Sequence, residues 1–168
     1  MITQQNFVKK NYPHALETQK KTGIPAIFIL AQAALETGWG KSAPGNMFFG
    51  VKDSDGINGN EQLLTTTEYS KKSNLKFPVI LGITEVIRNG QRWFKYRVRD
   101  YFRKYDTPEQ SFTDHARLIS RNKRYTEAMK YTSEPYRFAE EIHKAGYATD
   151  PEYTKKLHSV MRIIERFI

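Results

Sequence analysis

The stretch from Ile24 to Gly40 reads IPAIFILAQAALETGWG and contains the longest apolar run of the chain. Its apolar side chains recur at helical spacing, which predicts a helix from Ala26 to about Thr37. Pro25 suits the first position of that helix, and the two glycines that follow Thr37 end it. The apolar run is interrupted by Gln32 and is too short to cross a bilayer, so we expect a core helix.

Helical patterns are also predicted on both sides of this stretch. Thr3 is suited to cap a first helix, and Pro13 is expected to open a second one that ends at Gly23. Later in the chain, TPEQ (107–110) has the form of a capping box with proline at the first helical position. Two more helices are predicted to open at SEP (133–135) and at DPE (150–152).

Between residues 61 and 103 the pattern changes to that of strands. Asn89-Gly90 is a strong signal for a tight hairpin turn. After this turn, apolar and basic side chains alternate, which predicts a half-buried strand with a basic outer face. The apolar positions are Phe94, Tyr96, Val98 and Phe102, and the basic ones are Lys95, Arg97, Arg99 and Arg103. The fold class is therefore α+β, mainly α, with a small antiparallel β-lobe at about 61–103 of a single 1–168 domain.

Composition limits the possible functions. The chain has 168 residues, and its 27 Lys+Arg against 18 Asp+Glu give a formal net charge of +9. Such a charge favours an anionic partner such as nucleic acid, an acidic membrane face or the bacterial cell wall. Cysteine is absent, which removes disulfide scaffolds and thiolate chemistry. The dispersed histidines lack metal-ligand spacing, so we expect no metal or other cofactor.

Glu36 is the most informative single residue. It stands at the C-terminal end of the predicted apolar helix, where the partial negative charge of the helix terminus opposes an ionised carboxylate. Apolar neighbours and Trp39 are expected to desolvate it, which also favours the protonated form. A carboxylic acid that stays protonated near neutral pH is what general acid catalysis needs. The alternative from the residues alone is a solvent-facing glutamate on an amphipathic helix.

The stretch 24–40, which contains Glu36, resembles the catalytic helix of glycoside hydrolase family 73, the peptidoglycan N-acetylglucosaminidases. Further segments resemble motifs of that family in the same order: FGVK (49–52), TTEY (66–69), FRKYD (102–106), NKRY (122–125) and AGYATDP (145–151). The resemblance implies a lysozyme-like fold in which a helical lobe and a small β-lobe flank a glycan cleft. It also implies endo-cleavage of the β-1,4 bond after N-acetylglucosamine.

The resemblance further assigns roles to residues. It implies that Glu36 is the general acid, that Glu68 is a second catalytic carboxylate, and that Tyr147 lies near the sugar. Gln32 shares the helix face of Glu36 and is expected to line the same site. Aromatic rings would offer flat faces to sugars, and the candidates are Trp39, Phe49, Tyr69, Tyr125 and Tyr147. For Trp39 and Phe49, packing in the core is an equal alternative.

The position of the second carboxylate leaves one alternative open. Residues 71–88 look like an insertion relative to shorter family members, and they place Glu85 nearest the Asn89-Gly90 turn. The local motif favours Glu68, whereas the position in the hairpin would favour Glu85. The separation of the two carboxylates decides between direct nucleophilic attack and activation of a water molecule. The resemblance to the family leaves assistance by the substrate's own N-acetyl group as a further alternative.

Two other function classes compete with the enzyme. The basic strand, with Trp93 and Tyr101 among its cations, has the composition of a nucleic-acid-binding surface. A catalytically inactive wall-binding module is the second alternative, and the presence of Glu36 argues against it. The sequence predicts a monomeric hydrolase of peptidoglycan glycan strands, not a nucleic-acid binder. It is expected to act in the cell envelope or outside the cell, with no signal peptide or transmembrane segment apparent in the chain.

Overall fold

The computed structural model describes residues 2–55 and 57–168 and divides the chain into two compact units. The helical unit is Met1–Phe49 together with Tyr105–Ile168, and the β unit is Gly50–Lys104. The chain therefore leaves the helical unit once and returns to it. This organisation confirms the α+β class with helices predominating.

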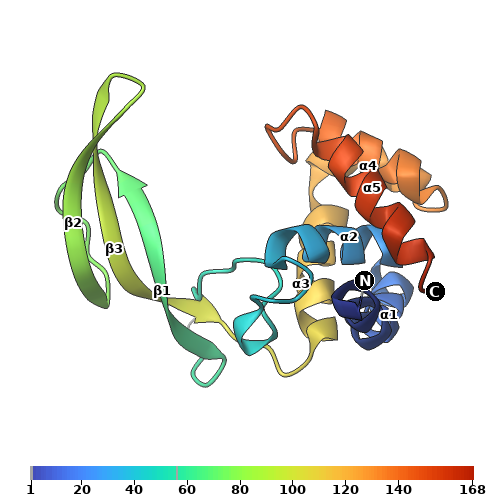
Figure 1. Cartoon of the computed structure of the whole chain (residues 1–168). Coiled ribbons are helices and arrows are strands. Elements are labelled where there is room, and N and C mark those ends of the chain that lie inside the picture. The colour runs from blue at the N-terminus through green and yellow to red at the C-terminus, as the bar shows by residue number, and fades with distance from the viewer. Residues whose placement is uncertain (1, 56) are drawn as a thin grey trace. The chain divides into compact units, whose positions relative to one another are not determined.

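Five α-helices and three 3-10 helices lie in the described part of the helical unit (Figure 1). The α-helices are α1 (Ile2–Thr22), α2 (Ala26–Thr37), α3 (Pro108–Arg121), α4 (Pro135–Lys144) and α5 (Tyr153–Glu165). The short 3-10 helices are η1 (Pro44–Asn46), η2 (Lys123–Tyr125) and η3 (Ala128–Tyr131).

Helix α2 is the central helix of this unit, with the bounds that the sequence predicted. Most of its side chains are buried, and it packs against α1, α4 and α5. Phe28 meets Phe138 of α4 edge to face, with ring centroids 4.8 Å apart. Gly38 ends the helix with a φ of 60°, a left-handed conformation that glycine adopts at little cost.

The predicted helix break at Pro13 is wrong, because α1 continues through this residue. A proline inside a helix loses one backbone hydrogen bond and normally costs several kcal/mol. Phe7, Val8 and Ala15 lie on both sides of Pro13 and are buried in the core. Burial of this continuous apolar face outweighs the local cost. Gly23 ends the helix as expected, with a φ of 80°.

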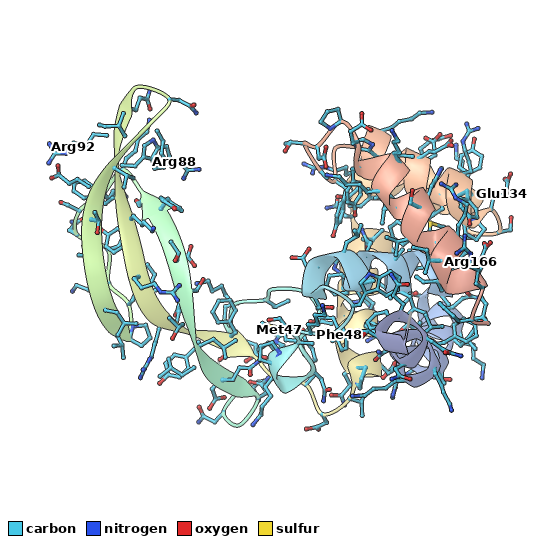
Figure 2. The ribbon with its side chains drawn as sticks, viewed as in Figure 1. Met47, Phe48, Arg88, Arg92, Glu134 and Arg166 are labelled. Carbon is cyan, nitrogen blue, oxygen red and sulfur yellow. The ribbon has the colours of Figure 1, made fainter. Side chains whose placement is uncertain are left out.

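The β unit is a three-stranded antiparallel sheet in the order β1-β3-β2. Its strands are β1 (Glu61–Ser70), β2 (Val79–Arg88) and β3 (Gln91–Arg103). Asn89 and Gly90 have φ angles of 52° and 72°, as a two-residue hairpin turn between right-twisted strands requires. Arg88 and Arg92 flank this turn and project to opposite sides of the hairpin (Figure 2).

The strand pleat gives the sheet two faces of different character. On the first, which we call the Tyr96 face, Tyr96 and Val98 are fully buried. The segment between β1 and β2 contacts this face: the Tyr96 hydroxyl donates to the Lys72 carbonyl at 2.5 Å, and the Phe77 ring lies 5.5 Å from that of Tyr96. The opposite face carries the exposed cations of β3, so the predicted alternation is confirmed.

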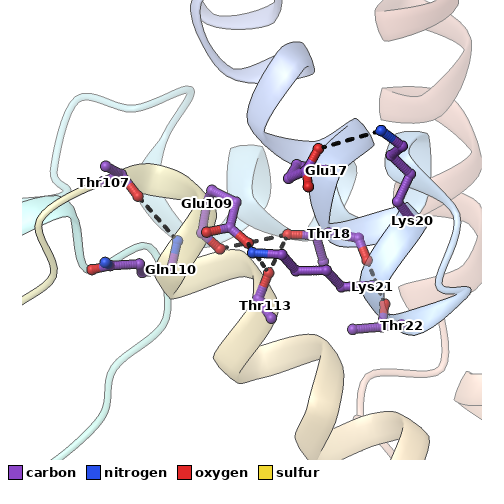
Figure 3. A network of polar contacts seen from close by, with 9 residues as sticks. All are labelled: Glu17, Thr18, Lys20, Lys21, Thr22, Thr107, Glu109, Gln110 and Thr113. Carbon is purple, nitrogen blue, oxygen red and sulfur yellow. Dashed lines mark hydrogen bonds and ion pairs between the residues drawn. The ribbon is translucent and has the colours of Figure 1, made fainter.

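Helices α1 and α3 are joined by a polar network (Figure 3). The Thr18 and Thr113 hydroxyls lie 2.7 Å apart, and Thr113 also donates to the Glu109 carboxylate at 2.7 Å. Lys21 donates to the same carboxylate oxygen at 2.8 Å. The Thr107 hydroxyl caps α3 by accepting from the Gln110 N–H, as the sequence predicted.

Replacing Glu109 by glutamine is expected to lower the melting temperature by about 3–6 °C near pH 7, because a partly buried charge-assisted network is lost. Burial alone would raise the pKa of Glu109, but hydrogen bonds from Lys21 and Thr113 lower it below its usual 4.5. A carboxyl whose pKa is depressed by folding stabilises the fold above its unfolded pKa, and this contribution disappears as the pH falls. The difference in melting temperature between wild type and the Glu109 variant should therefore shrink as the pH falls toward about 3.

Thermal unfolding followed by circular dichroism at both pH values tests this expectation. Glu17→Gln is the matched control, because the Glu17 side chain is 48% exposed and its partner Lys20 lies 3.8 Å away. An exposed pair of this kind contributes little, so the control should melt within about 1 °C of wild type. If the melting temperatures of wild type and the Glu109 variant differ by the same amount at both pH values, the role assigned to the Glu109 charge is contradicted.

Candidate functional site

Glu36 lies in the last turn of α2 with its side chain exposed. The expected shielding of Glu36 by Trp39 is not found. Trp39 instead packs edge to face on Phe7 of α1, with ring centroids 5.6 Å apart. Among the residues that the structure describes, no hydrogen bond or ion pair engages the Glu36 carboxylate. Its carboxylate is therefore accessible to a ligand.

The backbone that follows Glu36 turns sharply through three left-handed residues. Gly38, Trp39 and Gly40 have φ angles of 60°, 62° and 82°. A bulky residue such as Trp39 rarely adopts this conformation, and its packing on Phe7 offsets the cost. At Gly40, a Cβ atom would lie 3.1 Å from the Phe7 ring, so a side chain there would crowd this ring in addition to straining the backbone.

Gln32, one helical turn before Glu36, is only 3% exposed and is engaged through both ends of its amide. Its Nε2 donates to the Tyr153 hydroxyl at 2.8 Å, and its Oε1 lies 2.9 Å from His115 Nε2. Since the amide oxygen can only accept, His115 Nε2 carries a proton. Burial lowers the pKa of His115 to about 4, so the imidazole is neutral near pH 7. His115 is thus a neutral, hydrogen-bonded structural residue.

Three tyrosines lie next to this amide. Tyr147 and Tyr153 are stacked with ring centroids 5.6 Å apart, and Tyr125 lies 6.3 Å from Tyr147. Burial raises the pKa of Tyr153 to about 12, and the nearby Glu36 charge acts in the same direction. Burial, together with Tyr153 and Glu36, also raises the pKa of Tyr147. Both phenols therefore keep their protons at neutral pH and can donate hydrogen bonds.

The helical unit thus brings four of the predicted site residues into one neighbourhood: Glu36, Gln32, Tyr125 and Tyr147. Sequence reasoning missed Tyr153 as a member, because its position in the apolar stripe of α5 pointed only to core packing. Phe49 is 7% exposed and stacks on the His115 ring at 3.6 Å, so it supports the cluster from the core. Tyr125 is likewise 7% exposed.

In the β unit, Glu68 belongs to a cluster of charges on the Tyr96 face. The Lys52 ammonium lies 2.7 Å from the Glu68 carboxylate and 2.6 Å from that of Asp100, and it also sits 4.7 Å above the Phe102 ring. Partial burial opposes the charged form of Lys52, yet hydrogen bonds to Asp100 and Glu68 raise its pKa. The ammonium therefore stays charged between two carboxylates. Its contact with Glu68 joins two sequence motifs, FGVK and TTEY.

Glu85 lies on the same face as Glu68 but in a more open setting. Strand pairing places Glu85 opposite Phe94, next to the hairpin turn. Its side chain is 59% exposed and pairs with Arg92 at 2.6 Å, whereas the Glu68 side chain is 34% exposed. Of the two candidates for the second carboxylate, Glu68 is the more enclosed.

Tyr69 and Glu68 are neighbours in one motif but point to opposite faces of the sheet, because side chains alternate along a strand. Tyr69 pairs with Lys95, and the Arg88 guanidinium lies 4.3 Å from the Tyr69 ring centroid. The two residues therefore do not line the same surface of the β unit.

Two negative findings concern the described residues. Within residues 2–55 and 57–168, no group of three or more His, Asp or Glu side chains is arranged to hold a metal ion. No helix of this described part combines the length and apolar character needed to cross a membrane.

Comparisons with known proteins give a consistent result. The family model described as mannosyl-glycoprotein endo-beta-N-acetylglucosaminidase matches residues 12–166. The chain is 32% identical to the peptidoglycan hydrolase FlgJ of Pseudomonas aeruginosa, over 96% of this chain and 37% of FlgJ. It is 30% identical to the exo-glucosaminidase LytG of Bacillus subtilis, over 94% of this chain and 50% of LytG.

A solved structure supports the fold assignment. The glycoside hydrolase domain of Salmonella typhimurium FlgJ matches with a TM-score of 0.72 and 29% identity, over 97% of this chain and 98% of that domain. The chain spans half or less of the length of these curated FlgJ and LytG relatives.

Proposed function

The chain belongs to the glucosaminidase family of glycoside hydrolases, and from this premise we propose that it is an endo-β-N-acetylglucosaminidase of peptidoglycan. We infer cleavage of the β-1,4 bond after N-acetylglucosamine. One observation carries the proposal: the accessible carboxylate of Glu36 lies near a partly buried network of tyrosine, glutamine and histidine side chains. The names of the FlgJ relatives support peptidoglycan as the substrate.

In this proposal Glu36 is the general acid that protonates the leaving glycosidic oxygen. The phenols beside it contribute hydrogen bonds. Since Tyr153 accepts a hydrogen bond from Gln32, its own proton is left to donate to a ligand. Tyr147, stacked on Tyr153, supplies a second phenol hydroxyl and an aromatic ring for contact with the sugar. Gln32 acts as a positioning residue that holds Tyr153 through one end of its amide and contacts His115 through the other.

Glu68 is the proposed second carboxylate. Glycoside hydrolysis by two carboxyl groups requires one protonated and one ionised partner. The charged ammonium of Lys52 against Glu68 supports the ionised role, and Asp100 holds Lys52 from its other side. We propose that residues 1–168 together form one catalytic domain, which acts as a monomer in the cell envelope or outside the cell.

Mass spectrometry of digested peptidoglycan tests the proposed bond specificity. We expect products whose reducing end is N-acetylglucosamine. Reducing-end N-acetylmuramic acid would instead identify a muramidase, and free peptide stems would identify an amidase. Early in digestion, an endo-enzyme releases fragments of many lengths. An exo-enzyme, as the name of LytG describes that relative, would release units from chain ends alone.

A further inference from the structure

The face of the β unit opposite the Tyr96 face is strongly basic, and we call it the basic face. Strand register places the side chains of Lys95, Arg97 and Arg99 there, together with Arg88 of β2. Lys71, just after β1, reaches the same face, where its ammonium lies 5.2 Å from the Trp93 ring centroid. All five of these cations are exposed.

These cations have no acidic partner among the described residues. Three of the four acidic side chains of the sheet, Glu68, Glu85 and Asp100, lie on the Tyr96 face, where Lys52 and Arg92 pair with them. The fourth, Glu61, lies at the end of the basic face, opposite Arg103. Arg97 donates only to the neutral Thr67 hydroxyl at 3.0 Å. Apart from Glu61 at one end, charge is thus segregated between the two faces, and the five cations leave the basic face with an excess of positive charge.

Two aromatic rings on the basic face, Tyr69 and Trp93, are already covered by cations, whereas Tyr101, 45% exposed on the same face, has no such contact among the described residues. Arg88 lies 4.3 Å from the Tyr69 centroid and 5.7 Å from that of Trp93, on which Lys71 is also placed. Such contacts order the long basic side chains and occupy the ring faces. A nucleic-acid binder of the stacking type needs free rings to receive bases. Around Tyr69 and Trp93 the face is therefore better suited to anionic groups than to bases or sugar rings.

We propose that the basic face binds the carboxylate groups of the peptide stems of peptidoglycan. This inference rests on the proposed function, because the polymer that Glu36 would cleave carries these carboxylates itself. Lys95, Arg97 and Arg99 alternate along one strand, so their side chains emerge about 7 Å apart. An arginine guanidinium group can bind a carboxylate through two parallel hydrogen bonds. The row of basic side chains along β3 therefore suits the successive carboxylates of the peptide stems.

Binding of the whole chain to purified peptidoglycan, measured by co-sedimentation, tests this proposal. Two probes are compared: strands that carry their peptide stems and strands whose stems have been removed by an amidase. At about 0.05 M salt, Arg97→Gln/Arg99→Gln should weaken binding to stem-bearing strands about fivefold. The difference should vanish near 0.5 M salt, where exposed charges are screened. Stem-free strands keep only the lactyl carboxylate that the amidase exposes on each muramic acid, so on them the difference between wild type and variant should fall below about twofold.

The matched control is Lys9→Gln/Arg166→Gln, which removes the same charge from exposed positions of the helical unit. This control should weaken binding less than twofold. Equal weakening by both variants, or an equal difference on stem-free strands, would overturn the proposal. Tighter binding of wild type to single-stranded DNA than to stem-bearing strands, at the same salt, would assign the face to nucleic acid instead.

Hydrolysis of stem-free glycan strands, measured in parallel, separates this proposal from the proposed function. If wild type cleaves no glycan, the proposed function fails, while the binding comparison still tests the basic face. Equal cleavage of stem-free strands by wild type and by the Arg97/Arg99 variant would support the proposed function. If the two proteins then also bind stem-bearing strands equally, only the basic-face proposal fails.

Discussion

Replacing Glu36 by glutamine should abolish hydrolysis of peptidoglycan and leave the fold intact. The amide has the shape of the carboxyl group but cannot deliver a proton, and general acid catalysis contributes about 10²–10⁴-fold. The exposed Glu36 side chain has no hydrogen bond or ion pair within the described structure, so its replacement removes no stabilising contact. We expect turnover below about one hundredth of wild type and an unchanged melting temperature.

Clearing of a peptidoglycan suspension, followed by mass spectrometry of the soluble products, measures this loss. Glu17→Gln makes the same chemical change at an exposed position of α1 and should retain wild-type turnover. A purified Glu36 variant that keeps more than about a tenth of wild-type turnover would show that another group supplies the proton.

The second large effect is expected at Glu68. Glu68→Gln should lower turnover at least tenfold, whereas Glu85→Gln should change it less than threefold. The physical reason is the difference in setting: Glu68 is held by Lys52 at 2.7 Å in a partly enclosed cluster, whereas Glu85 beside the turn is 59% exposed and paired with Arg92. A carboxylate held in place can act on a substrate with little reorganisation.

Steady-state turnover of both purified variants decides between the two carboxylates. Both should melt within a few degrees of wild type, because neither side chain is part of the core. The reverse order of effects would move the assignment to Glu85. Near-normal turnover of both variants would mean that Glu36 works without a protein carboxylate partner, and the N-acetyl group of the substrate would then be the candidate.

Much of the fold was predictable because the relevant signals are local. The apolar period of α2, the Asn89-Gly90 turn and the alternation along β3 each reflect the geometry of a single element. Pro13 shows the limit of local signals, because a helix-breaking residue is tolerated where the helix buries apolar side chains on both sides of it. The opposite orientations of Glu68 and Tyr69 also follow from strand period alone.

The sequence by itself determined most of the elements, the uneven charge of β3 and the position of Glu36 at the end of α2, whereas the exposure of Glu36 came from the structure. Only the tertiary structure decided which distant side chains meet. Gln32 contacts His115 and Tyr153, which are 83 and 121 residues away, and Lys52 contacts Asp100 across 48 residues. The physical reason is that local periodicity reports which face of an element is buried, whereas the partner on that face depends on how whole helices and strands pack.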